Sequence, residues 1–279
     1  MVRIITDSAA DLEPWEYEKL NVTCIPLNVY FSGNEYQENV NLSKDQFYAL
    51  LAGGEYPKTS QPSPQCLLDL IEQAEAAGDE ILYISISSAI SGTYQTALAT
   101  KEMSEYAGCY ILDSKNATGG QRILVEYAAR LRDEGNSAEE IVAGLEAIQG
   151  KIVLYACMDT LEYLYRGGRI SQTVYKLGTL AQVKPIIRVS ETGSIEVPAK
   201  AMGMRKGMEF LCKRVEMQKP SQDFPFYVMY TGVRQNGELL AQKYRAMGIE
   251  VPEERIINVG AAIGSHVGAN ACGMVYVEA

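Results

Sequence analysis

The chain has 279 residues, 47% of them hydrophobic, and its 25 basic and 35 acidic residues give a formal net charge of −10. This length exceeds the roughly 100–200 residues typical of one domain, so we expect two domains. The excess of negative charge argues against nucleic acid and anionic membrane surfaces as partners. No apolar run approaches the ~18 residues of a membrane span, and the first strand begins without a secretory leader. We therefore expect a cytoplasmic protein with no membrane span.

The first third of the chain predicts a strand, a helix and then a departure from the main sheet. Residues 2–6 are typical of a buried strand, and a helix begins near Glu13-Pro14, because proline suits a first helical turn. The extended runs 22–31 and 35–40 are joined by a turn containing Gly33 and Asn34. They predict a small hairpin excursion near residues 22–42. A helix capped by Ser43 and ending at Leu51 follows.

A loop rich in hydroxyl groups comes next, at residues 58–64. It contains Thr59 and Ser60, and two prolines, Pro62 and Pro64, fix an extended path that forbids helix until about Pro64. The helix that follows presents an apolar face, as a helix packed on a sheet does.

The stretch 81–100 combines a strand, a turn and a helix in a way that predicts an anion site. Residues 81–86 form a nearly continuous apolar run, typical of a strand buried on both faces of a parallel sheet. Serine, glycine and threonine crowd into 85–93, and 94–102 has helical spacing. A helix start presents free N–H groups, to which Ser91 and Thr93 add hydroxyl donors. The alternative is that Ser91 only caps the helix.

The alternation of elements predicts a parallel sheet with helices on both faces. A strand at 109–113 is followed by a helix at 122–134, which continues the order seen before it. Ligands of such sheets lie at the carboxyl ends of the strands. Short polar residues follow three predicted strands, at Asp7-Ser8, at 85–93 and at Asp113-Ser114. We expect these three loops to meet.

The second half predicts a mixed sheet. A helix at 137–149 leads to an apolar strand at 151–158, and a further helix is expected at 173–181. The runs 184–190 and 195–201 flank a turn with Gly193, a good hairpin signal. Further strands are predicted at 226–231, 255–259 and 273–277. We expect residues 1–150 to form the parallel-sheet α/β domain and residues 151–279 a second α/β domain with a mixed sheet.

The sequence offers no motif for a cofactor, a nucleotide or a metal. It has no P-loop, GxGxxG or GxSxG segment. Its six cysteines lie far apart without a CxxC pair, which argues against a zinc site and a disulfide scaffold. They are Cys24, Cys66, Cys109, Cys157, Cys212 and Cys272. We therefore expect neither a metal nor a cofactor.

Two further residues have a context that indicates function. His266 is the sole histidine, and the glycines around it let the backbone approach a ligand closely. Arg169 follows Gly167 and Gly168, and its planar fork suits a carboxylate or a phosphate. The alternatives are a structural histidine and an ordinary surface arginine.

Six short motifs occur in order along the chain. They are Ile5-Thr6-Asp7-Ser8, Thr59-Ser60-Gln61-Pro62-Ser63, Ser91-Gly92-Thr93-Tyr94-Gln95, Asp113-Ser114, Arg166-Gly167-Gly168-Arg169-Ile170 and Gly264-Ser265-His266-Val267-Gly268. Together they resemble the DegV family of bacterial fatty-acid-binding proteins over essentially the whole length. The resemblance implies a Rossmann-like three-layer domain, a two-layer α/β domain with a mixed sheet, and a long-chain fatty acid whose tail is buried.

The resemblance also implies where the fatty-acid carboxylate is held. The head group is expected on Thr59 and Ser91, and the arginine and histidine of the family fall on Arg169 and His266. A carboxylate has about four acceptor sites and is best satisfied by several donors at once. The N–H groups of the Gly92 turn can join these donors, and we include two neighbouring hydroxyls, Ser60 and Thr93, among the expected ligand-binding residues.

The resemblance implies a partner as well. Relatives in Gram-positive bacteria present fatty acid to a separate ATP-using kinase subunit and carry away the acyl phosphate, which links them to phospholipid synthesis. This chain is then a lipid-binding subunit of a fatty acid kinase system and not itself an enzyme. A basic cluster of Lys200, Arg205 and Lys206 is a candidate docking surface, and a solvated face is the alternative.

Two other functions remain open at this point. A serine-type esterase or thioesterase could use Ser91 and His266 with Asp7 or Asp113, although a chain with so many serines permits many such triads. A regulatory or scaffold protein would bind a protein partner and no lipid.

Overall fold

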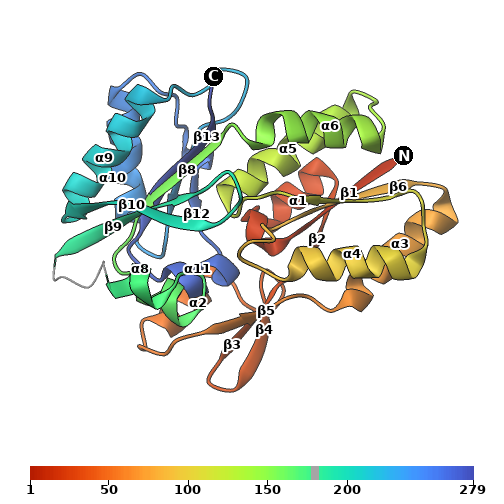
Figure 1. The fold of residues 1–279 in the computed structure, drawn as a ribbon, viewed down its shortest axis with the longest axis horizontal. Helices are drawn as coiled ribbons and strands as arrows, with labels where there is room; N and C mark the ends of the chain where they lie inside the picture. The colour runs from red at the N-terminus through yellow and green to blue at the C-terminus, as the bar shows by residue number, and fades with distance from the viewer. Residues whose placement is uncertain (177–181) are drawn as a thin grey trace.

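The computed structural model describes residues 1–176 and 182–279. Its first sheet is parallel, as predicted, and has four strands in the order β2-β1-β6-β7 (Figure 1). The strands are β1 (Val2–Asp7), β2 (Val22–Ile25), β6 (Glu80–Ser85) and β7 (Cys109–Asp113). The short helix η1 (Ser8–Ala10) follows β1, and the surrounding helices are α1 (Pro14–Leu20), α3 (Pro64–Ala77), α4 (Thr93–Ser104), α5 (Gly119–Asp133) and α6 (Ala138–Gln149).

Both faces of this sheet are buried, which explains the continuous apolar run at residues 81–86. Successive side chains of a strand point to opposite faces. Ile4 and Leu82 accordingly pack in the same core as α5 and α6, whereas Ile5 and Ile81 pack with α3 and α4. The predicted arrangement of helices on both faces is confirmed.

The second sheet is six-stranded and mixed, with the order β10-β9-β8-β13-β11-β12. Its strands are β8 (Ile152–Cys157), β9 (Val183–Val189), β10 (Ile195–Met202), β11 (Tyr227–Tyr230), β12 (Ile256–Asn258) and β13 (Cys272–Val277). The predicted hairpin is the antiparallel pair β9 and β10, and the β11–β12 pair is parallel. Helices α9 (Met204–Met217) and α10 (Arg234–Ala246) pack on one face.

The two sheets share the helical layer of α5 and α6. Ile123 of α5 and Leu145 of α6 belong to one core with Met229 and Val275 of the second sheet. In Figure 1 this layer crosses the top of the view, between the two sheets. A domain boundary at residue 150 stays a prediction, because the two halves have a common core.

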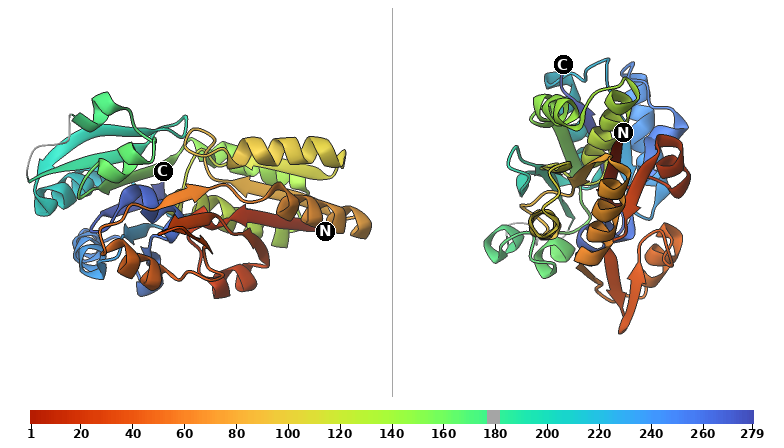
Figure 2. Two further views of the ribbon diagram at one scale, coloured as in Figure 1. Left: turned by 90° about the horizontal axis from the view of Figure 1, so that it is seen from below. Right: turned by 90° about the vertical axis from the view of Figure 1, so that its right-hand side faces the viewer.

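The excursion from the first sheet is a separate, three-stranded antiparallel sheet with the order β4-β3-β5. It consists of β3 (Asn28–Phe31), β4 (Asn34–Gln37) and β5 (Lys58–Ser60), with α2 (Lys44–Leu51) between β4 and β5. Figures 1 and 2 show its strands projecting away from the two larger sheets. The structure differs from the sequence-based prediction on two points. Val22–Ile25 joins the main sheet and not the excursion, because Pro26 interrupts the run, and the segment predicted as a hydroxyl-rich loop contains the edge strand β5.

Four short helices remain among the described residues. They are α7 (Glu162–Arg166), α8 (Gln172–Lys176), the short η2 (Glu253–Arg255) and α11 (Ala261–Val267). Helix α11 packs against η1, α2, α7, β3 and β5, so it joins the excursion to the second half. Of the helix predicted at 173–181, residues 177–181 lie outside the described residues. Across the described chain, no helix is both long and apolar enough to span a bilayer.

Candidate functional site

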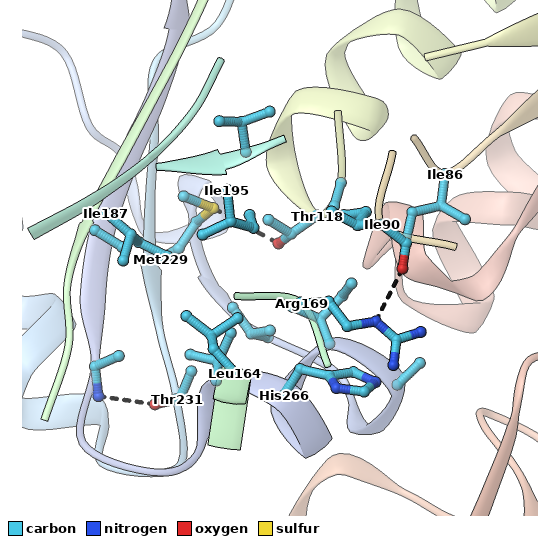
Figure 3. A pocket seen from close by; sticks show the side chains of 18 of the residues that line it. Ile86, Ile90, Thr118, Leu164, Arg169, Ile187, Ile195, Met229, Thr231 and His266 are labelled. Carbon is cyan, nitrogen blue, oxygen red and sulfur yellow. Dashed lines mark hydrogen bonds between the residues drawn. The ribbon is translucent and has the colours of Figure 1, made fainter. Parts of the chain in front are cut away.

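A cavity of about 390 Å³ lies between the two sheets and the excursion. Its walls are mostly aliphatic and come from both halves of the chain, for example Ile86 and Ile90 on one side and Leu164, Ile187 and Met229 on the other (Figure 3). The volume is within the ~300–1,000 Å³ of small-molecule sites. The cavity can therefore take an elongated apolar group.

Polar residues gather at one end of this cavity. Six of the seven predicted ligand-binding residues line it, and they come from four segments that are far apart in sequence. These six are Thr59, Ser60, Ser91, Gly92, Arg169 and His266. The seventh, Thr93, lies behind Ser91: it is buried, and its Oγ1 is 2.9 Å from Ser91 Oγ. Thr93 therefore supports Ser91 and does not itself line the cavity.

His266 is held at the cavity by a contact with the excursion. Its Nε2 is 2.8 Å from Thr59 Oγ1, whereas Nδ1 is buried and has no hydrogen-bond partner within the described residues. Burial, together with the nearby positive charge of Arg169, lowers the pKa of His266 from 6.5 to about 3. The imidazole is thus neutral at physiological pH, and a charged carboxylate in the cavity would favour its protonation.

The glycines that precede Arg169 make room for the imidazole. A Cβ atom built at Gly167 would lie 2.1 Å from His266 Nδ1, so any side chain at this position displaces the ring. Gly168 has φ +76°, a conformation that glycine adopts without strain. Steric constraints therefore favour glycine at both positions: at Gly167 a side chain would displace the imidazole, and at Gly168 the positive φ disfavours any other residue.

Arg169 brings a positive charge to the polar end. Its Nε donates to the carbonyl of Ile90 at 2.9 Å, and its Nη1 donates to the carbonyl of Gly167. Burial lowers the pKa of Arg169, although a guanidinium stays charged in proteins. Among the described residues no carboxylate forms an ion pair with Arg169. A partly buried cation without a counter-ion indicates an anionic ligand.

The start of α4 completes the polar end. Gly92 is the N-cap of this helix, and the N–H of Thr93 donates to Ser91 Oγ at 3.3 Å. Ser91 therefore precedes the N-cap, accepts from the first N–H group of the helix and also lines the cavity, so the alternative that Ser91 only caps the helix does not describe its position. The first turn of α4 adds partial positive charge, as helix N-termini do.

Two polar residues that line the cavity, Gln61 and Thr118, were not among the residues predicted to bind the ligand. Gln61 lines the cavity beside Gly92, and its Oε1 accepts from Thr96 Oγ1 at 2.7 Å. Its position inside the hydroxyl-rich loop was the available signal. Thr118 lines the apolar part with its hydroxyl 3.6 Å from Met229 Sδ (Figure 3), and only its place after a predicted strand end pointed to it.

The residues proposed for a Ser–His–Asp triad do not form one. The imidazole contacts Thr59 instead of Ser91. Asp7 accepts from the N–H of Ile86 at 2.8 Å, while Asp113 Oδ1 accepts from backbone N–H groups of the following loops. Since neither aspartate orients the histidine, the esterase reading has no support in the geometry.

The predicted docking residues lie outside the cavity. Lys200 on β10 and Lys206 on α9 are exposed, and Arg205, also exposed, has its Nε 3.3 Å from Glu209 Oε1. Their role stays a prediction. Within the described residues, no group of three or more His, Cys, Asp or Glu side chains could hold a metal ion.

Comparisons with known proteins give a consistent result along the chain. The family model described as "Uncharacterised protein, DegV family" matches residues 1–279. A DegV domain-containing protein of Clostridium perfringens is 33% identical over 273 residues, which cover 95% of this chain and 93% of that protein. This chain is thus similar to a whole relative and not to one part of it.

Solved structures are similar over the same length. A DegV family protein from Thermus thermophilus, described as fatty acid binding, has a TM-score of 0.89 at 29% identity and covers 100% of this chain and 99% of its own. A fatty acid binding DegV family protein from Streptococcus agalactiae has a TM-score of 0.88 at 28% identity, with 99% of this chain and 98% of its own covered.

We predict that His266 titrates far below the ordinary histidine range. Because it is the sole histidine, its imidazole resonances in an NMR pH titration are unambiguous, and we expect a midpoint near 3 in the lipid-free folded protein. The unfolded chain binds this proton from 6.5 downward, so the stability contributed by the neutral ring is lost as pH falls from 6.5 to 3.

Two arginine variants test whether the charge of Arg169 contributes to the lowered pKa of His266. Arg169→Gln removes the charge that disfavours the imidazolium and should raise the midpoint, whereas Arg166→Gln, an exposed arginine paired with Glu162, should leave it unchanged. A folded-state midpoint near 6.5 in the parent protein would contradict the buried, neutral imidazole.

Proposed function

The chain belongs to the DegV family, and from this premise we propose that it binds a long-chain fatty acid, with its carboxylate at the polar end of the cavity and its tail between the two sheets. The observation that carries the proposal is the division of the cavity into one polar end with an uncompensated arginine and an aliphatic remainder. A fatty acid has the same division of chemistry.

The tail supplies most of the binding free energy. Each CH₂ group removed from water contributes about 0.8 kcal/mol, so a long chain contributes far more in total than any head-group contact. Aliphatic walls from Ile86, Ile187 and Met229 provide this burial without polar groups that the tail would leave unsatisfied.

The carboxylate is oriented by donors from three segments. The hydroxyls of Thr59 and Ser91 and the N–H groups at the start of α4 are neutral donors, and Arg169 supplies charge. His266 is neutral in the empty site, so it adds a hydrogen-bonding group without a second fixed positive charge. This set suits a carboxylate, and an acyl phosphate presents similar acceptor oxygens.

A further part of the proposal is that this protein presents its fatty acid to a separate ATP-using kinase subunit. The chain has no P-loop, and the polar end of its cavity is lined by Ser91 and Gly92 at the start of α4. The basic cluster of Lys200, Arg205 and Lys206 is the proposed docking surface.

We predict that a long-chain fatty acid remains bound to the protein during purification. Denaturing extraction followed by mass spectrometry should recover a long-chain fatty acid at near-stoichiometric level, because the tail has a much higher free energy in water than in the apolar cavity. Protein that is free of lipid as purified and also fails to bind added oleate or palmitate would rule out the proposed function.

Loss of a head-group donor should weaken binding. Ser91→Ala or Thr59→Val removes a hydrogen bond to a charged group, worth about 1.5–3 kcal/mol, so we expect the dissociation constant for oleate to rise about tenfold or more. Ser104→Ala, at the opposite end of α4, is the matched control and should bind like the parent. If both site variants keep parental affinity while remaining folded, the head group lies elsewhere.

Charge reversal tests the docking surface. Lys200→Glu combined with Lys206→Glu should slow acyl-phosphate formation by an added fatty acid kinase subunit, because opposite charges steer association. Fatty-acid affinity should be unchanged, since both side chains lie outside the cavity. The same reversal at Lys19 and Lys213 is the control, and equal effects of the two double variants would contradict a specific docking role.

A further inference from the structure

Two buried carboxylates meet at the start of α11. Asp11 Oδ1 accepts from the N–H of Gly260 at 2.8 Å, and Glu38 Oε1 accepts from the N–H of Ala262 at 3.1 Å. A Cβ atom built at Gly260 would lie 2.2 Å from Glu38 Oε1 and 2.7 Å from Asp11 Oδ1. Each acidic residue is only 1% exposed. The two groups therefore approach the same small volume.

The surroundings compensate two negative charges only in part: Lys44, Thr118 and Ser8 lower the pKa values of the pair, but burial outweighs them. Asp11 Oδ2 and Glu38 Oε2 have no hydrogen-bond partner within the described residues, although both atoms are buried. Two cations lie nearby and both are already paired: Lys44 Nζ is 2.6 Å from Glu13 Oε1, and Arg122 pairs with Glu16 and Glu126. Like charges that are buried side by side cannot both ionise at low cost, so such pairs retain a proton.

Burial is the main cause that raises the pKa of Glu38, to about 7, and the charge of Asp11 adds to it. Burial also raises the pKa of Asp11, against the opposing charge of Lys44. The other titratable or charged groups that face the pair are Glu13, Tyr17 of α1, Cys24 of β2, Lys44 and Tyr48 of α2, and Arg122 of α5. The pKa values of the two tyrosines and the cysteine are raised, so these three stay neutral where Glu38 titrates.

The pair is attached to the wall of the fatty-acid site. Ala262, which binds Glu38, lines the cavity, and so does Val259, which precedes Gly260. His266 lies one turn further along the same helix. Glu38 belongs to the excursion, which also carries Thr59, the contact of His266. The carboxylate pair and the Thr59–His266 contact therefore join the same two parts of the molecule.

We propose that Asp11 and Glu38 share one proton and act as a positioning pair that holds α11, and through it His266, in the geometry that receives the fatty-acid carboxylate. With the proton present, the pair is one carboxylic acid and one carboxylate held by two backbone N–H groups. When the proton leaves, two buried charges repel each other at the helix start and the hold on α11 weakens. The effect on ligand binding rests on the proposed function.

The direction with pH follows from the folded and unfolded states. Glu38 in the unfolded chain loses its proton near 4.5, whereas in the folded protein it retains the proton to about 7. The folded state therefore binds more protons between these values, and the contribution of the pair to stability is lost as pH rises through this window. This is opposite to the direction for His266.

The test compares Glu38→Gln with Glu72→Gln in the full-length protein. Glutamine keeps an acceptor for the N–H of Ala262 but cannot ionise, and Glu72 is an exposed residue of α3 that serves as the control. The readout is the NMR signal of the sole histidine in lipid-extracted protein. His266 in the folded protein titrates near 3, so a shift of its resonances centred near pH 7, where Glu38 loses its proton in the folded state, reports on its surroundings.

We expect this shift in the parent and in Glu72→Gln, and its loss in Glu38→Gln. We also expect the thermal midpoint of Glu38→Gln to gain on the parent as pH rises through the window. Parallel histidine shifts or parallel stability profiles in all three proteins would overturn the shared proton and its link to α11.

Fatty-acid affinity is the second arm. The dissociation constant for oleate should rise by about fivefold or more as the pH rises through about 7 in the parent and in Glu72→Gln, relative to Glu38→Gln, the smaller end of typical coupling between sites. Titration of oleate itself is common to all three and cancels. Equal pH profiles of affinity would overturn the positioning role, whereas a complete lack of oleate binding by the parent would instead overturn the proposed function, with the histidine signal still deciding on the pair.

Discussion

The position of the cavity depends on where the helical layer of α5 and α6, shared by the two sheets, begins. Helices α5 and α6 fill the gap between the two sheets, and α5 starts at Gly119, where a Cβ atom would lie 2.5 Å from Val275 Cγ1. Just before that glycine, Ala117 and Thr118 line the cavity. The cavity is therefore the part of the gap that the layer leaves open, next to the carboxyl ends of β1 and β6, where ligands of parallel sheets are found.

The placement of the site divides into a predictable and an unpredictable part. The rule for parallel sheets directed attention to Ser91, which follows β6 and lines the cavity, whereas the reason for the double glycine before Arg169 became visible only in the structure. The pairing of Thr59 with His266 rested on family resemblance, because no periodic pattern links residues 207 positions apart. Hydroxyl-rich segments do not show by sequence whether they form loops or edge strands, and β5 is an edge strand.

Asp11 and Glu38 show the limit of sequence reasoning most clearly. An aspartate after a turn and a glutamate beside a hairpin are typical of surface positions. Both are buried because α11, 249 residues beyond Asp11 at the Gly260 contact, covers them. Burial of this kind is a property of tertiary packing, and a single sequence carries no local sign of it. The same holds for the neutral state of His266, which depends on Arg169 and on the walls around it.

The distribution of chemistry favours holding a ligand over transforming it. A hydrolase needs a base that is oriented by an acid and directed at a nucleophile. Here the imidazole has one buried nitrogen without a partner and contacts a threonine, while the buried acids bind backbone N–H groups elsewhere. Among the described residues, the site therefore has donors that suit a carboxylate, and the residues proposed for a Ser–His–Asp triad are not arranged as one.

The long separation between Thr59 and His266 has a consequence for biosynthesis. Strand β13, near the end of the chain, lies in the interior of its sheet between β8 and β11. A nascent polypeptide emerging from the ribosome can form the parallel sheet early, since domains fold from the N-terminus as they are made. The contact between Thr59 and His266 is formed only after residue 266 has emerged and docked, so the proposed binding site is assembled late in synthesis, after the parallel sheet.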